Sequence, residues 1–168
     1  MKRSIGVGTV VLVGVTALGC DSPQATAPSL TSPLFAAATT TAITATAPLT
    51  IAAPGRMWVS GGIVHVRDLV LVGPVSGDIT GTITTVARLD VAQATGDGTV
   101  SGTFTISGAA GGWEGSFHGN FDGGVFSDRL IGRGTGANEG QILRGSIAQT
   151  APTTNVVQLT GTILNPGG

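Results

Sequence analysis

The chain has 168 residues, of which 41% are hydrophobic and only 10% charged, and its formal net charge is −1. Its 8 Lys and Arg residues are too few to form the basic face that nucleic-acid binding requires, so we expect no nucleic-acid partner. The low charge and the 28 glycines disfavour a helical protein and favour short strands joined by tight turns, in one domain with appendages.

Residues 1–19 have the layout of an export signal. Lys2 and Arg3 form a positive start, and an apolar stretch runs from Ile5 to Leu18. A helix that spans a bilayer needs about 20 apolar residues, so this shorter stretch fits the core of a secretory signal better. The sequence therefore predicts a signal peptide over residues 1–19.

The chain's single cysteine, Cys20, follows this stretch directly. The run Ala17-Leu18-Gly19-Cys20 resembles the lipobox of bacterial lipoproteins, although that family usually has Leu in place of Ala17 and Ala or Ser in place of Leu18. The resemblance implies a diacylglycerol thioether on Cys20, removal of the preceding peptide and acylation of the new amino terminus. Two or more acyl chains give stable membrane anchoring. We therefore expect an exported protein whose membrane partner is reached through lipid on Cys20, in the inner or the outer membrane of the cell envelope. An ordinary cleaved signal or an uncleaved anchor is the alternative.

Residues 20–54 have the composition of a spacer. They are rich in Thr, Ala, Pro and Ser, and no charged residue lies between Asp21 and Arg56. Such a segment buries too little apolar surface to offset the entropy lost on ordering, which predicts a disordered tether. As an alternative, residues 34–49 add a strand or a short helix to the domain, because four of them are more apolar than a spacer requires. These residues are Leu34, Phe35, Ile43 and Leu49.

Residues 55–168 show the period-two alternation of β-strands and no helical period. The clearest example runs from Trp113 to Phe121, where bulky apolar residues and glycines alternate with polar residues. Turns that contain glycine or proline separate the candidate strands. These strands cover residues 56–60, 63–72, 79–83, 100–106, 113–121, 125–133, 141–149 and 159–163.

Five glycines in this part precede Ser or Thr and then Ile or Phe, so that each shares a strand face with a large apolar residue. They are Gly81, Gly102, Gly115, Gly145 and Gly161. Alternating large and small residues on an inward face fit the tapering interior of a small barrel, and closure removes exposed sheet edges. We therefore predict an all-β fold, a small closed antiparallel β-barrel of about eight strands, with a two-sheet β-sandwich as the alternative.

The run Gly111 to Gly119, with the sequence GGWEGSFHG, precedes a second strand that ends in Gly132-Arg133-Gly134. This pair resembles the glycine-rich hairpin of allene oxide cyclase-like barrels, a calycin-type group that also includes dirigent proteins. The resemblance implies an eight-stranded barrel with a central cavity. It also implies an isomerase, a cyclase or a protein that guides the coupling of hydrophobic substrates, in each case without a cofactor. The polar cavity residues of the plant cyclase have no matching motif here, so its catalytic assignment does not carry over.

Residues that could perform chemistry are sparse. His65 and His118 fall in separate candidate strands without a cysteine or a close carboxylate pair, so we expect no metal site. Side chains two apart on a strand are roughly 7 Å apart, too far for a hydrogen bond between a nucleophile and its base. We therefore expect four polar residues of the strand 113–121 to form a solvated outer face. They are Glu114, Ser116, His118 and Asn120.

The candidate strand 125–133 places one charge on the same face as apolar residues, whichever phase faces inward. That charge is Asp128 in one phase and Arg129 in the other. A buried charge persists only when it is paired or hydrogen-bonded. We expect it to pair with a neighbour such as Arg144, and the alternative is contact with a ligand at the mouth of a cavity. Trp58 and Trp113 are expected in the core, with ligand contact at a barrel mouth as the alternative.

Two functions from different classes follow from these observations. The first is a non-catalytic envelope barrel that binds a small hydrophobic ligand or has a structural or interaction role; a homo-oligomer is compatible with the sequence. The second is a cofactor-free isomerase or cyclase in which Glu114, His118, Asp128 and Arg129 supply the polar groups, and it rests on the resemblance alone. A pocket of at least about 300 Å³ with two or more ionisable groups would favour the enzyme, and an apolar hollow the binding protein.

Overall fold

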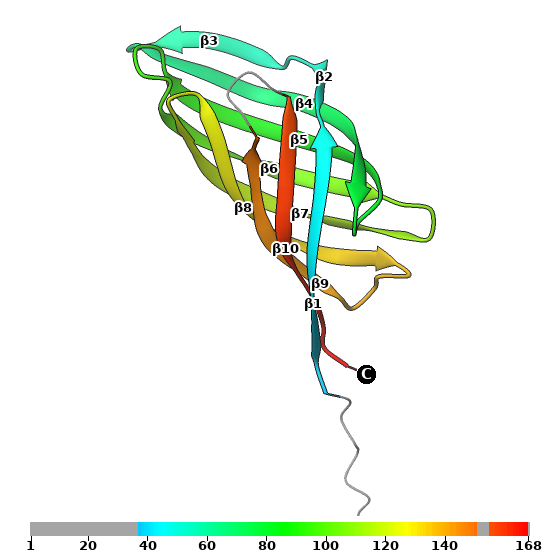
Figure 1. Cartoon of the computed structure of the whole chain (residues 1–168). Coiled ribbons are helices and arrows are strands. Elements are labelled where there is room, and N and C mark those ends of the chain that lie inside the picture. The colour runs from blue at the N-terminus through cyan, green and yellow to red at the C-terminus, as the bar shows by residue number, and fades with distance from the viewer. Residues whose placement is uncertain (1–36, 151–154, 168) are drawn as a thin grey trace, which may run out of the picture. The chain divides into compact units, whose positions relative to one another are not determined.

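The computed structural model describes residues 37–150 and 155–167, so the predicted signal peptide, Cys20 and the first part of the predicted spacer lie outside the described residues. Among the described residues, none belongs to a helix that could cross a membrane. Ten strands account for the regular structure of this part of the chain (Figure 1). They are β1 (Thr39–Pro48), β2 (Thr50–Ala53), β3 (Arg56–Ser60), β4 (Ile63–Gly77), β5 (Gly81–Ala92), β6 (Gly98–Ser107), β7 (Gly111–Asp122), β8 (Val125–Gly136), β9 (Ile142–Gln149) and β10 (Val156–Asn165).

Eight of these strands close into an antiparallel ring. Their order is β1-β10-β9-β8-β7-β6-β5-β4, and β4 returns to β1 where Ala45 pairs with Gly77 and Thr46 with Ser76. Consecutive strands pair over long stretches, for example along 12 residues between β7 and β8. The predicted small antiparallel barrel is therefore confirmed, and the two-sheet sandwich is not the arrangement that forms.

Residues 39–53 belong to the barrel rather than to the spacer. β1 pairs with β10 from Thr39 to Pro48, and β2 continues along β4. The side chains of Ile43, Ala45 and Ala47 are exposed at 5% or less. The spacer predicted for residues 20–54 is thus wrong for 39–53, and the alternative of an added strand is confirmed. Alanines on the inward face and threonines on the outward face gave this strand a weak apolar signal, although they satisfy the period-two pattern.

Glycines and bulky side chains share the interior of the ring. Residues that pair across antiparallel strands lie on the same face, so inward positions form rows around the barrel. One row consists of Ile43, Gly161, Gly145, Leu130, Phe117, Gly102 and Ala87. At Gly102 a Cβ atom would lie only 2.8 Å from Cζ of Phe117, and Phe104 covers Gly132 at the same distance. The predicted alternation toward a closed centre is confirmed, because the glycines make room for aromatic rings.

The two ends of the barrel differ in how they are filled. At the end where β1 begins and β10 finishes, Ile79, Ile106 and Trp113 are exposed at 6% or less and close the interior. The opposite end carries the turns from β5 to β6 and from β7 to β8, together with the end of β9 and the start of β10. β3 lies outside the ring, pairs only with β4, and extends the sheet past this second end (Figure 1). The second end is therefore the one that can admit a ligand.

Candidate functional site

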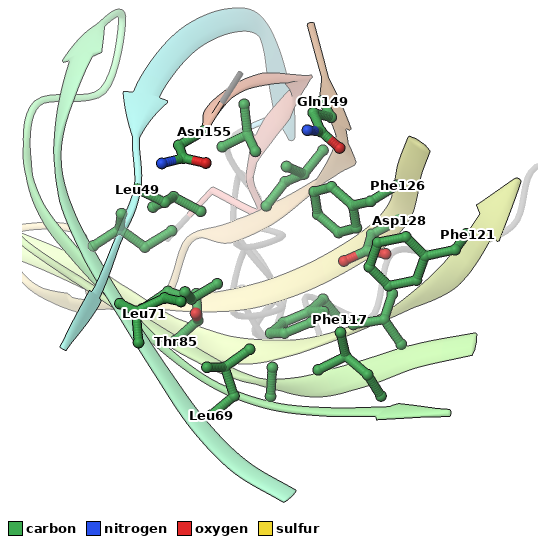
Figure 2. A pocket seen from close by; sticks show the side chains of 17 residues that line it. Leu49, Leu69, Leu71, Thr85, Phe117, Phe121, Phe126, Asp128, Gln149 and Asn155 are labelled. Carbon is green, nitrogen blue, oxygen red and sulfur yellow. The ribbon is translucent and has the colours of Figure 1, made fainter. Parts of the chain in front are cut away.

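A pocket of about 260 Å³ occupies the interior at this second end (Figure 2). Its wall is built mainly from inward-facing apolar side chains of β4, β5, β7 and β8. They include Leu69, Leu71, Leu89, Phe117, Phe121 and Phe126. An engineered apolar cavity of about 150 Å³ holds benzene, so this pocket has room for a larger organic molecule.

Four polar side chains interrupt the apolar wall. Gln149, at the end of β9, and Asn155, just before β10, lie toward the mouth (Figure 2). Thr85 of β5 and Asp128 of β8 are much more deeply buried, with exposed fractions of 5% and 4%. Neither Oγ1 of Thr85 nor the two carboxylate oxygens of Asp128 have a hydrogen-bond partner among the described residues. The pocket therefore offers two buried polar groups whose hydrogen-bonding capacity the protein leaves unused.

Asp128 is the one ionisable residue among the described residues that line this pocket. Burial disfavours the charged form of a carboxyl group that has no cation beside it. This desolvation raises the pKa of Asp128 from 3.8 to about 7. The charge of the pocket therefore changes close to neutral pH.

The register of the barrel explains why a carboxylate fits at this position. Asp128 lies in a row of inward positions between Ile147 of β9 and Gly119 of β7. A Cβ atom on residue 119 would lie 2.1 Å from Oδ1 of Asp128 and 2.0 Å from the carbonyl oxygen of Ser127. Glycine is therefore required opposite Asp128, since any side chain there would collide with the carboxyl group and with the backbone.

Of the two possible inward faces of β8, the structure shows the one that carries Asp128. It faces inward with Phe126 and Leu130, whereas Arg129 is exposed on the outer face. The expected ion pair with Arg144 is wrong, because Arg144 is exposed on the outer face of β9 and the carboxylate of Asp128 has no hydrogen-bond partner in the described part of the chain. Asp128 lines the pocket, as a buried part of its wall and not at the mouth that the alternative named, and its contact with a ligand stays a prediction. Strand phase alone could not reveal this, because it does not show which side chains of other strands share the interior.

The four candidate catalytic residues are not brought together. Glu114, His118 and Arg129 are exposed on the outer faces of β7 and β8, while Asp128 alone lines the pocket. The expected solvated outer face of β7 is confirmed, because its four polar residues are all exposed. They are Glu114, Ser116, His118 and Asn120.

The two tryptophans have different environments, and neither lines the pocket. Trp113 is a core residue with an exposed fraction of 3%, as expected. Trp58 is 44% exposed, so its predicted place in the core is wrong. β3 pairs with β4 alone, and all five of its residues are exposed. Instead, the indole of Trp58 stacks on His65 at a centroid distance of 5.1 Å, and the Arg67 guanidinium lies 5.4 Å from its ring.

A polar cluster fixes this extension of the sheet to the barrel. Nη2 of Arg67 donates hydrogen bonds to both carboxylate oxygens of Asp90, at 2.8 and 3.0 Å, and Nδ1 of His65 lies 2.5 Å from Oδ1. The hydrogen bonds from His65 and Arg67 hold the pKa of Asp90 below its ordinary value. Within this cluster the charges of Arg67 and Asp90 are paired, and the contact of His65 with Asp90 gives the histidine a structural role. The described residues hold no group of three or more His, Cys, Asp or Glu side chains suited to a metal ion.

Thr85 is the buried polar residue of the site that the sequence did not predict, and the apolar lining residues and the amides Gln149 and Asn155 were not predicted as site residues either. Thr85 follows two other threonines of β5, and the usual order of faces is reversed because the polar Thr85 is buried while the apolar Val86 is exposed. The available signal was the spacing of Ile83, Thr85 and Ala87, which share one strand face. The two apolar neighbours in this phase place the Thr85 hydroxyl inside the barrel.

Comparison with known proteins gives no indication of the function, so the function is inferred from the pocket. No protein-family model matches the sequence, and no curated protein is significantly similar to it.

Proposed function

We propose that this protein is a lipid-anchored protein of the bacterial cell envelope whose barrel binds a small hydrophobic molecule without chemical conversion. The observation that carries the proposal is the pocket of about 260 Å³, which is walled by leucines and phenylalanines and contains a single ionisable group. Small-molecule sites commonly combine a predominantly apolar wall with a few polar groups that orient the ligand. Removal of apolar ligand surface from water supplies the driving force, at about 25 cal/mol per Å².

A cofactor-free isomerase or cyclase is the second candidate, and one observation favours it. Asp128 has a pKa of about 7 inside an apolar cavity, which suits a general acid or base at neutral pH. Such chemistry also needs a second polar group to stabilise the charge that develops on the substrate. Glu114, His118 and Arg129 lie outside the pocket, and the buried Thr85 hydroxyl lies on another part of its wall, away from the carboxyl group (Figure 2). The binding protein is therefore the preferred function.

A pair of tryptophan substitutions on β5 tests the binding site. Leu89→Trp should weaken the binding of 2-phenylethanol by at least about tenfold, because the indole would occupy the pocket that Leu89 lines. Val86→Trp adds the same side chain to the same strand at an exposed position and should change the affinity by less than about twofold. Isothermal titration calorimetry on the full chain measures both. Failure of the unsubstituted chain to bind, or equal loss in both variants, would contradict the proposal.

The lipid anchor is tested at Cys20. The thioether to diacylglycerol requires a thiol, so Cys20→Ser should prevent acylation and leave an unprocessed or soluble precursor. Metabolic labelling with a radioactive fatty acid and separation of membrane from soluble fractions measure the two effects. Unchanged labelling and unchanged membrane association in the variant would show that the lipid is not on Cys20.

A further inference from the structure

We propose that the pocket selects an apolar molecule that carries a primary amine, with the protonated amine bound to the Asp128 carboxylate. The inference rests on the proposed function of the pocket as a ligand site and adds the chemical class of the ligand. It starts from the two most buried polar groups of the wall, Asp128 and Thr85, which have no hydrogen-bond partner among the described residues. Buried polar groups in native proteins are nearly always paired, so two unpaired groups in one pocket call for an explanation.

No charged group of the surrounding strands faces the carboxyl group of Asp128. Across the ladder its neighbours are Gly119 on β7 and Ile147 on β9. The wall contributed by β4, β5, β6 and β10 contains no ionisable residue. The charged residues next to it on the surface, His118 and Arg129, belong to the outer face. The described residues therefore supply no cation for Asp128, and a ligand can.

The local sequence provides the space that the carboxyl group occupies in the wall of the pocket. Gly119 leaves free the space into which Oδ1 of Asp128 extends. Figure 2 shows the Asp128 carboxylate at the wall among phenylalanine rings, with Thr85 on another part of the same wall. A ligand with one donor-rich end and an apolar body matches this distribution of polar and apolar groups.

The chemistry of the carboxylate distinguishes among ligands with the same apolar body. An ammonium group adds the attraction between opposite charges to its hydrogen bonds with the carboxylate, which a neutral hydroxyl cannot do. A ligand carboxylate would bring a second negative charge into an apolar site and would be rejected. The order of affinity at pH 8 is therefore amine first, alcohol second and carboxylate last.

Three ligands with one phenyl ring and a two-carbon chain test this order on the full chain: 2-phenylethylamine, 2-phenylethanol and phenylacetate. By calorimetry at pH 8 we expect the amine to bind at least about tenfold more tightly than the alcohol. In Asp128→Asn the amine should lose this advantage, so that the ratio of the two affinities falls to about one. The isosteric amide removes the charge and keeps the size of the side chain.

Proton release on ligand binding is a second test, and it does not require a substituted protein. Asp128 is about half protonated at pH 7, so binding of the cationic amine to the carboxylate should release protons to the buffer. Calorimetry in two buffers of different ionisation enthalpy measures this release, and the alcohol should show none.

The outcomes separate the inference from the function on which it rests. If the alcohol binds and the amine binds no more tightly, without proton release, the amine class is wrong and the apolar ligand site stands. If none of the three molecules binds, both proposals fail. Tight binding of phenylacetate would also overturn the amine class, because it would require a cation that the described wall does not contain.

Discussion

Replacing Asp128 by asparagine should raise the free energy of unfolding by about 2 kcal/mol at pH 8 and by only a few tenths of a kcal/mol at pH 4. The native protein binds the Asp128 proton more tightly than the unfolded chain does, because the pKa is about 7 in place of 3.8. Stability due to this group is therefore complete below about pH 4 and is lost as the pH rises through 7. The ideal limit is about 4 kcal/mol, and we expect roughly half because the pocket opens to water.

Chemical denaturation of both proteins at pH 4 and pH 8 measures this effect. Glu114→Gln is the matched control, since it also neutralises a carboxylate but on the exposed outer face of β7, and it should leave stability unchanged at both pH values. An equal effect of Asp128→Asn at pH 4 and pH 8 would mean that the carboxyl group of Asp128 is ionised in the native protein throughout this range.

Gly115→Ala should lower the free energy of unfolding by about 3 kcal/mol, a large part of the stability of a typical domain. A Cβ atom there would lie 2.0 Å from the carbonyl oxygen of Ile131 and 2.7 Å from Cα of Gly132. Both are backbone atoms of β8, which cannot move away without weakening its ladder with β7. The strand would have to separate locally, and thermal or chemical denaturation measures the cost.

The adjacent Ser116→Ala is the control for this substitution. Ser116 is exposed on the outer face of the same strand, so its replacement should change stability by less than about 0.5 kcal/mol. Comparable effects of the two substitutions would show that residue 115 does not face the packed interior.

The glycine pattern made the barrel predictable, whereas its first strand was hard to recognise. Units such as Gly102-Thr103-Phe104 combine a strand period with large and small residues on one face, and a closed barrel accommodates that combination. β1 carries only Ile43 and small alanines on its inward face, so its composition also suits a spacer. The residues that decide between the two are its partners on β10 and β4, which are distant in the sequence.

The site was predictable only in part, for the same reason. The sequence showed that one charge of this strand had to share a face with apolar residues. It could not show whether Asp128 pairs with an arginine or lines a cavity. That outcome depends on the row that joins Ile147, Asp128 and Gly119, and the row exists only once the register of three strands is known. The prediction for Trp58 failed because it considered only the residue type. A bulky aromatic residue on a strand that pairs only with β4 remains outside the core.

Intermolecular nuclear Overhauser effects between 2-phenylethanol and the full chain test the internal ligand site most directly. We expect contacts from the ligand's ring protons to Leu71 and Phe117, which line the pocket. Contacts to Val86 or Ile131, which are exposed on the outside of the barrel, with none to the lining residues, would contradict a ligand site inside it.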